Sequence, residues 1–295
     1  MSDISYLREP SKPSEAEEPG VPDGYVPYDR TKLSYAGTFT DPRRAAVIRV
    51  MEWLTGKARL LYLIRKFERE GVEEGQEFFA HALRVMGIRI DTPAEQITRI
   101  PATGPLVVVA NHPHGLVDGM VLADLIGRVR TDYKILTRSL LTGVPEIGQF
   151  MIPVPFPHEA DARERNLEMR RETMAHLSDG GVIVLFPSGS VASSETALGP
   201  AVEKEWNPFT AKIIRLSGAT VLPVHFAGSN SRAYQIANQV SATLRQGLLL
   251  HEVVYALNKP QAPVIRAPIR PAEWGPMAQN PKEFMAWLRA RTLEG

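Results

Sequence analysis

Two histidines and an aspartate that follow an apolar run are the residues best suited to chemistry in this chain. Residues 106–110 are apolar and mostly β-branched, without alternation, which is typical of a buried strand. His112, His114 and Asp118 lie in the polar loop that comes next. Open α/β sheets place their ligands at the carboxyl ends of strands, so this loop is a candidate active site. A histidine with a carboxylate to orient it is the minimum equipment of a general base.

Two other interpretations of this loop stay open. Asp118 has a residue type suited to the N-cap of the helix expected near residues 119–129, which is a purely structural role. His112 and His114 have the spacing of a His-x-His metal site, and a metal-dependent hydrolase is the corresponding function. The residues between His114 and Asp118 carry no coordinating side chains, so such a site needs ligands from elsewhere. We expect no metal and no resident cofactor.

A second loop repeats this arrangement. The apolar run 182–186 ends in Pro187, Ser188, Gly189 and Ser190. Proline and glycine fix a sharp turn and expose backbone amides, which can stabilise an oxyanion or hold an anionic group. The loop lacks the Gly-x-Ser-x-Gly of a nucleophile elbow and the Gly-Lys-Ser/Thr core of a P-loop. The alternative is a structural turn with capping serines.

The elements that must position these loops alternate between strands and helices from residue 88 to about residue 270. This alternation predicts an α/β fold with a mixed, largely parallel sheet flanked by helices. We expect strands at 88–90, 97–100, 106–110, 133–136, 150–154, 182–186 and 221–226, with one more, beside a helix, within 236–257. We expect the other helices at 119–129, 160–178, 208–217 and 281–291, with Gly218 ending the third of them, and a helix or turn at 139–150.

The first 87 residues have a different composition. Residues 1–40 are rich in Pro, Glu, Ser and Gly and are expected to form a mobile or surface-draped arm, pinned by Tyr25, Tyr28 and Tyr35. Residues 41–87 have helical spacing, beginning with Asp41 and Pro42 as an N-cap and N1 pair. Basic residues alternate there with apolar ones, which suits a membrane-surface helix or, equally, a hairpin packed on the core. We therefore divide the chain into 1–40, 41–87 and an α/β domain at 88–295, which contains both loops.

Composition narrows the classes of function. The chain has 295 residues, no cysteine and a net charge of +1. The missing cysteine excludes a thiol nucleophile, a thiolate metal site and disulfides. The charge balance does not point to nucleic acid, and nucleic acid is not among the expected partners. No apolar run reaches the roughly 18 residues of a transmembrane helix, and the first residues lack the pattern of a signal peptide, so any work on lipids is expected from the membrane surface.

The two loops together resemble the glycerolipid acyltransferases of the lysophosphatidate-acyltransferase superfamily. That family carries Asn-His-x4-Asp and then Phe-Pro-Glu-Gly-Thr-Arg. Here Asn111, His112 and Asp118 stand in the first motif and residues 186–190 in the second, and residues 221–224 match a later Val-x-Pro-Val-like strand. The likeness covers roughly residues 88–270. It is strongest to the bacterial hemolysin-like or lyso-ornithine-lipid branch, whose first motif, Asn-His-Pro-x-Gly-x-x-Asp-Gly, is matched position by position by residues 111–119.

The resemblance implies an acyl transfer with no enzyme nucleophile. His112 takes a proton from a hydroxyl of the acceptor, and Asp118 orients the ring, so these two are the expected catalytic residues; His114 is the weaker candidate for the base. The acyl donor is expected to be acyl-carrier protein or acyl-CoA, and the place of action the cytoplasmic face of the inner membrane, as a peripheral protein. The residues expected to bind substrate are Asn111, His114, Arg138, Phe186, Pro187, Ser188, Gly189, Ser190 and Pro223.

The departures from the family motif bear on the acceptor. Five residues, not four, separate His112 from Asp118, and Ser188 and Val191 stand where the family has Glu and Arg. Arginine and lysine usually neutralise a bound phosphate. The loss of the family's arginine therefore favours a lyso-aminolipid over a phosphate-bearing acceptor. The rival acceptor is lysophosphatidate, with charge supplied by Lys134, Arg138 or Arg232. A non-enzymatic lipid-binding scaffold is the remaining alternative. The aromatic pair Trp206 and Phe209 could line an acyl groove or belong to the core, and no chemistry is assigned to residues 228–232.

Overall fold

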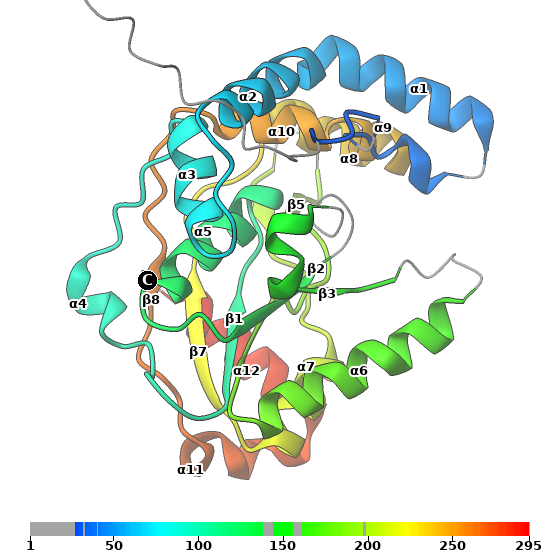
Figure 1. Ribbon diagram of the computed structural model, residues 1–295. Coiled ribbons are helices and arrows are strands. Elements are labelled where there is room, and N and C mark those ends of the chain that lie inside the picture. Colours follow the sequence, from blue (N-terminus) through cyan, green and yellow to red (C-terminus); the bar gives the residue numbers. More distant parts are fainter. Residues whose placement is uncertain are drawn as a thin grey trace, which may run out of the picture.

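A six-stranded sheet runs through the centre of the computed structural model, in the order β3-β2-β4-β1-β7-β8 (Figure 1). The first five strands in that order are parallel, and β8 is antiparallel to β7. The structure describes residues 27–31, 33–39, 41–137, 144–155, 161–196 and 199–294. The fold class expected from the alternating pattern is confirmed.

The strands are β1 (Leu106–Ala110), β2 (Tyr133–Thr137), β3 (Met151–Pro153), β4 (Val182–Leu185), β7 (Thr220–His225) and β8 (Val264–Ile265), with a separate hairpin of β5 (Ser193–Ser194) and β6 (Ala201–Val202). The α-helices are α1 (Pro42–Glu52), α2 (Ala58–Arg69), α3 (Glu77–Val85), α4 (Ala94–Ile97), α5 (Leu116–Gly127), α6 (Ala162–Ser178), α7 (Pro208–Ser217), α8 (Arg232–Val240), α9 (Ala242–Gly247), α10 (Leu249–Ala256), α11 (Pro271–Trp274) and α12 (Pro281–Leu293). Other helical segments within the described residues are η1 (Ala36–Thr38), η2 (Trp53–Lys57), η4 (Pro145–Phe150) and η5 (Gly275–Gln279).

Strand β1 is buried on both faces and joins two hydrophobic cores. Its residues alternate between them, with Leu106 and Val108 in one core and Val107 and Val109 in the other. A strand covered on both sides has no polar face, which is why the sequence shows an apolar run here rather than an alternation.

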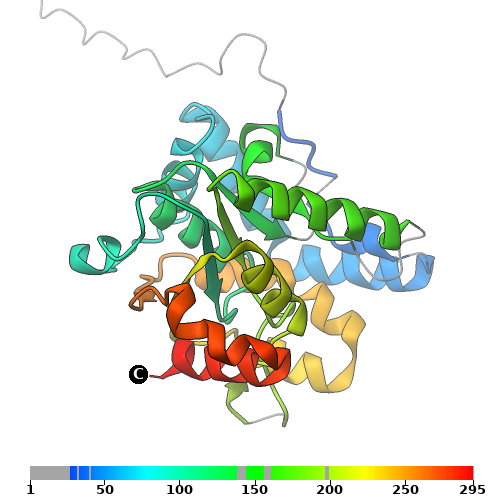
Figure 2. The same ribbon diagram turned by 90° about the horizontal axis from the view of Figure 1, so that it is seen from below.

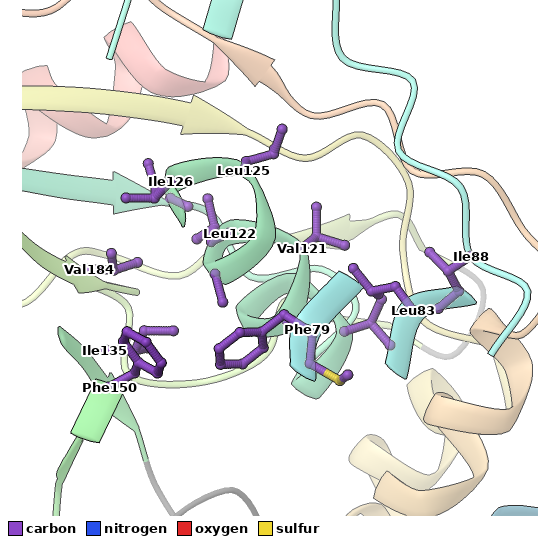
Figure 3. Packing of buried hydrophobic residues seen from close by; sticks show 14 of the residues in the cluster. Phe79, Leu83, Ile88, Val121, Leu122, Leu125, Ile126, Ile135, Phe150 and Val184 are labelled. Atoms are coloured by element: carbon purple, nitrogen blue, oxygen red, sulfur yellow. The ribbon is translucent and has the colours of Figure 1, made fainter. Parts of the chain in front are cut away.

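Helices cover both faces of the sheet. One face is covered by α3 and α5, with α2 and α10 outside them, and Figure 3 shows Phe79 of α3 and Leu122 of α5 in this core. The other face is covered by α6, α7 and α12, seen together in Figure 2. This layering leaves the carboxyl ends of β1, β4 and β7 at one edge of the sheet, since these three strands are parallel neighbours.

Several local expectations are confirmed. Asp41 accepts a hydrogen bond from the Arg43 N–H at 2.9 Å and caps α1, with Pro42 as the first helical residue. Gly218 ends α7 in the left-handed region, at φ +61°, where a residue without a Cβ is favoured. The segment after Phe150 forms β3 at the edge of the sheet, as expected.

Three expected strands are wrong. Residues 97–100 are the end of α4 and a turn, because the helix formers that follow Pro93 begin a short helix. Residues 88–90 make a single bridge, from Ile90 to Gln261, rather than a strand. Residues 236–257 contain α8, α9 and α10 and no strand, because a short apolar run such as 247–250 does not distinguish a buried helix from a buried strand. The last strand comes later, at β8.

The N-terminal helices pack on the core through one face. Helices α1 and α2 meet at the kink of η2, where a Cβ on Gly56 would lie 2.8 Å from Val254 of α10, so this close approach requires glycine. The buried carboxylate of Glu52 accepts from the Tyr35 N–H at 2.7 Å, and that of Glu68 from the Tyr28 N–H at 3.0 Å. The backbone at Tyr28 and Tyr35 is thus bound to helices α2 and α1, as expected for the second half of the arm. Tyr25 lies outside the described residues.

No helix within the described part of the chain combines the length and the apolar character needed to cross a bilayer. The outer face of α1 and η2 nevertheless carries exposed apolar side chains, led by Leu54 at 81% and Val50 at 59% exposure.

The aromatic centre of the α3 core generates a stability prediction. Phe79 is fully buried and packs edge-on against Phe150, at 5.8 Å between ring centroids. We expect Phe79→Ala to lower the free energy of unfolding by about 3–5 kcal/mol, since a large cavity replaces the ring. Leu54→Ala, at an exposed site, is the control and should change it by less than about 0.5 kcal/mol. Equal losses in urea denaturation would contradict this placement of the core.

Candidate active site

The loop after β1 turns sharply into α5. Gly115 has φ +68° and ψ −127°, a conformation that a side chain would strain, and it occupies the N-cap position of a helix that begins at Leu116. Asp118 therefore lies in the first turn of α5, fully buried, and not at its N-cap. The capping interpretation of Asp118 is wrong, and the helix begins earlier than expected because glycine takes the cap.

The buried carboxylate of Asp118 binds both imidazoles. The Nδ1 of His112 lies 3.0 Å from Oδ2, and the Nδ1 of His114 lies 3.0 Å from Oδ1. The backbone N–H of His114 also donates to Oδ2, at 2.8 Å. An ionised carboxylate can only accept hydrogen bonds, so each ring donates through Nδ1, which leaves the lone pair on Nε2 in the neutral form of the ring. His112 thus has the tautomer of a general base.

Burial and hydrogen bonding act in opposite directions on Asp118. Desolvation alone raises the pKa of the carboxyl, but the hydrogen bonds from His112 and His114, together with the charges that these rings carry when protonated, outweigh it and lower the pKa. Asp118 therefore stays ionised at neutral pH, as the orienting role requires.

The second loop packs directly on the first. The ring of Phe186 stacks on the His112 imidazole, with centroids 3.9 Å apart and an interplanar angle of 23°. After Pro187, the N–H of Gly189 bonds to the Phe186 carbonyl at 3.0 Å and closes a turn with Gly189 at φ +64°. The hydroxyl of Ser188 donates to the Ser190 carbonyl at 2.8 Å. The structure thus brings the two expected loops together.

Within the described residues, the Ser190 hydroxyl oxygen is buried and has no hydrogen-bond partner. Because the Gly189 amide is used inside the turn, the amides of Ser188 and Ser190 are the ones that this loop can offer to a substrate oxygen. A buried hydroxyl without a partner beside them adds a further donor.

Asn111 joins two strands at the site. Its side-chain nitrogen donates to the Phe226 carbonyl at 2.8 Å, and its oxygen accepts from the Phe226 N–H at 2.7 Å. The amide thereby continues the pairing of β1 with β7 beyond their ends. Asn111 holds the loop, and its predicted contact with substrate stays a prediction.

Buried groups from three later segments fix the backbone of the loop. The Glu203 carboxylate accepts from the His112 N–H at 3.2 Å, and the Ala192 N–H donates to the His112 carbonyl at 2.8 Å. With its side-chain amide turned so that the nitrogen faces acceptors, Asn230 donates to the Pro113 carbonyl at 3.1 Å and to Glu252 at 3.2 Å. Neither Glu203 nor Asn230 was expected at the site. The sequence draws attention to Asn230 only through the polar loop 228–232 that contains it, and no pattern in the sequence draws attention to Glu203.

The other predicted site residues lie around this centre. Pro223 is buried in β7, in register with Val109 of β1, two residues before Asn111. Arg138 lies outside the described residues. Of the alternative cations, Lys134 pairs with Glu172 at 2.6 Å, and Arg232 donates to the Gly199 carbonyl at 2.8 Å. Trp206 packs in the core beneath α7, and a contact of this residue with lipid stays a prediction.

An apolar cavity opens beside the His loop, with a volume of about 190 Å³. Leu116 and Met120, in the first turns of α5, form the wall nearest the loop. Its other walls come from α2, α3 and α10, including Leu60, Phe78 and Leu250. The cavity therefore reaches from α5 toward the N-terminal helices.

The donor set favours proton transfer over metal binding. Both oxygens of Asp118 already accept from imidazole N–H groups, so the carboxylate is not available to a cation. In the part of the chain that the structure describes, no three His, Cys, Asp or Glu side chains gather into a set able to hold a metal ion.

The lowered pKa of Asp118 predicts how stability depends on pH. Asp118→Asn places an amide between two N–H donors, and we expect it to cost about 1–3 kcal/mol of unfolding free energy at pH 7. Since the folded-state pKa is lowered, the wild-type advantage is present above the ordinary value of 3.8 and disappears as pH falls through the folded-state pKa. Denaturation of both proteins between pH 2 and 7 measures this, with Asp179→Asn, at an exposed site, as control. A pH-independent difference would contradict an ionised Asp118.

Comparison with known proteins gives two similar enzymes. The chain is 25% identical over 167 residues to a lyso-glycine lipid O-acyltransferase of Phocaeicola vulgatus, covering 56% of each chain. It is 25% identical over 171 residues to an enzyme of the same name from Bacteroides thetaiotaomicron, covering 57% of this chain and 59% of that one. The match thus spans little more than half the length of these relatives.

A solved structure and a family model complete the comparison. The 1-acyl-sn-glycerophosphate acyltransferase PlsC of Thermotoga maritima superposes with a TM-score of 0.44 at 14% identity, over 86% of both chains. The family model described as an acyltransferase matches residues 46–260, which contain both loops, the sheet from β1 to β7 and helices α1 to α10 except the first residues of α1. Because the match extends over well more than half of the chain, the chain belongs to this acyltransferase family.

Proposed function

We propose that the protein moves a fatty acyl group from a thioester, acyl-carrier protein or acyl-CoA, to the free hydroxyl of a lyso-lipid. The observation that carries this proposal is the His112 imidazole, held by a buried, ionised Asp118 with its Nε2 lone pair available. Family membership supports the acyl transfer. The absence of cysteine from the chain agrees with attack by the substrate's own oxygen.

The reaction begins with proton transfer. Nε2 of His112 takes the proton of the acceptor hydroxyl while its oxygen attacks the thioester carbonyl. Asp118 stabilises the imidazolium that results, as the acid of a Ser-His-Asp triad does. Stacking on Phe186 keeps the ring in one orientation, so the base is held in place before the substrate arrives.

Collapse of the tetrahedral intermediate completes the transfer. The carbon–sulfur bond breaks, the leaving thiolate takes the proton from His112, and the new ester remains. The oxyanion needs hydrogen-bond donors, and the Ser188 and Ser190 amides, with the buried Ser190 hydroxyl, are the candidates in the second loop.

The acceptor is proposed to be a lyso-aminolipid, in which an N-acylated amino acid or amino sulfonate bears a hydroxyl on its acyl chain. Val191 stands where the family motif has arginine. Its side chain lies beside Gly115, so that a Cβ added to that glycine would be 3.6 Å from Val191 Cγ2, and it brings no charge. Lys134 is already paired with Glu172. The names of the two relatives, both lyso-glycine lipid O-acyltransferases, agree with an amino-acid headgroup.

The apolar cavity suits an acyl chain of the donor or the acceptor. It is lined by α2, α3, α5 and α10 and begins at Leu116, next to the His loop. A buried apolar wall stabilises a hydrocarbon chain by about 0.8 kcal/mol per methylene removed from water. Binding there would leave the reactive end of the lipid at the mouth of the site.

The place of action is proposed to be the cytoplasmic face of the inner membrane. The exposed apolar side chains Val50, Trp53 and Leu54 lie on one stretch of α1 and η2. Exposed Arg43, Arg44 and Arg49 lie on the same helix and suit anionic lipid headgroups. A helix with apolar and basic residues on its outer surface is typical of interfacial contact rather than of insertion across the bilayer.

Acyl transfer by the purified protein tests the function. With an acyl thioester, we expect faster turnover of a lyso-aminolipid than of lysophosphatidate. His112→Ala should lower turnover by about 10²–10⁴-fold, the usual contribution of a general base. His114→Ala should be milder, because its ring holds only the second oxygen of Asp118, and addition of a chelator should have no effect.

The outcomes of this assay separate the alternatives. Faster turnover of lysophosphatidate would overturn the aminolipid acceptor, and no transfer to either lipid would overturn the function. Equal losses in the two histidine variants, together with inhibition by the chelator, would favour the metal-dependent hydrolase. Circular dichroism of each variant checks that its fold is intact.

Membrane contact is tested with vesicles that contain anionic lipid. The double variant Trp53→Ala/Leu54→Ala should bind at least about tenfold more weakly, because each large apolar side chain gains roughly 1.5–3 kcal/mol on full burial. Leu216→Ala, at a 56% exposed site on α7, is the matched control and should bind as the wild type does. Equal binding by all three proteins would show that this face is not the contact.

A further inference from the structure

Glu203 is a buried carboxylate that the proposed mechanism does not use. It follows β6, ninety-one residues after His112 in the chain, and its side chain is 6% exposed. Its Oε2 accepts from the His112 backbone N–H at 3.2 Å, and its Oε1 accepts from Nε1–H of Trp206 at 3.0 Å. Both oxygens are therefore used by N–H donors, and one of these donors belongs to the proposed catalytic residue.

The burial of this side chain indicates a specific role. Among the described residues, its carboxyl group forms no salt bridge, and Arg289 donates to its backbone carbonyl instead. A polar group taken out of water is costly unless its hydrogen bonds are made, so a buried carboxyl group is retained where its hydrogen bonds matter. Hydrogen bonds from N–H groups to a carboxylate are also stronger and more directional than those to a neutral acceptor.

The hydrogen bond from the His112 N–H to Glu203 holds the backbone of the loop where it leaves the sheet. His112 is the second residue after β1, at the point where the chain leaves the sheet and turns toward Gly115. The carbonyl of His112 is held on the opposite side by the Ala192 N–H, at 2.8 Å. Glu203 and Ala192 thus fix the peptide units on either side of the His112 Cα, while Phe186 and Asp118 fix its ring.

We infer that Glu203 is a positioning residue for His112, an inference that rests on the proposed function for its kinetic consequence. It holds the backbone of the base so that the imidazole meets both Asp118 and the acceptor hydroxyl. A displacement of the order of 1 Å at such a position costs up to about 10²-fold in rate.

Glutamine at this position gives a sharp test, because it keeps the size of the side chain but not its two acceptors. The amide of Glu203→Gln must turn its NH₂ toward either the His112 N–H or the Trp206 N–H, and two donors repel each other. Replacing the indole removes that conflict. In Glu203→Gln/Trp206→Phe, the glutamine oxygen can face His112 while its NH₂ points away.

The expected result is a loss in Glu203→Gln that is recovered in the double variant. We expect kcat to fall at least about tenfold in Glu203→Gln, with KM for the lyso-lipid changed less than about twofold, because positioning acts on the chemical step. Trp206→Phe alone leaves Glu203 bound to His112 and should lose less than about threefold. Glu205→Gln, an exposed neighbour, is the matched control and should match the wild type.

A second measurement does not depend on activity. The His112 backbone N–H should show a downfield proton shift and slow hydrogen exchange in the wild type, lost in Glu203→Gln and restored in the double variant. If the wild type transfers no acyl group, the proposed function fails, and this NMR signature alone decides the inference. The inference is overturned by wild-type kcat in Glu203→Gln, by a double variant no better than the single one, or by a His112 amide that does not respond to Glu203.

Discussion

The hydrogen bond between His112 and Asp118 is the constraint on which the rest of the site depends. It is strong because Asp118 is wholly buried, and Asp118 stays ionised there because two imidazole N–H groups and a backbone N–H compensate for the lost water. His114 thus has a part in the site that its spacing did not suggest. By occupying Oδ1, it leaves Oδ2 to face His112, so a residue that is a weak candidate for the base still determines the orientation of the acid.

The parallel sheet makes this arrangement possible. Strands β1, β4 and β7 are neighbours and end at the same edge, so the loops that follow them converge. Phe186 from the loop after β4 covers the face of the His112 ring, and Phe226, just after β7, pairs with the Asn111 amide. Each loop alone has too few contacts to fix a side chain, and the site is rigid because three of them bind one another.

The sequence could predict the parts of this structure that depend on local pattern. Both loops were found because apolar runs followed by polar turns are visible in one stretch of chain, and the caps at Asp41 and Gly218 were found for the same reason. The sequence does not reveal Glu203, because its partner His112 lies ninety-one residues away and nothing near Glu203 is unusual, and the polar loop 228–232 does not show that Asn230 bonds to Pro113, 117 residues away. The start of α10 resembles a strand because the apolar run 248–250 is too short to show a helical period.

The proposed function also accounts for where the cavity lies relative to the exposed apolar face. Helices α1 and α2 are joined through η2, whose Gly56 contacts α10, and both α2 and α10 line the cavity. Trp53 and Leu54, in η2, point outward from the same assembly of helices that encloses Leu60 and Leu250. A lipid chain that left a bilayer at this face would pass from one apolar environment to another, and the exposure of hydrocarbon to water, which is the main cost of extracting a lipid, would be small. Under the proposed function, the N-terminal helices receive the lipid from the membrane, and His112 acts on it beside the other end of the cavity.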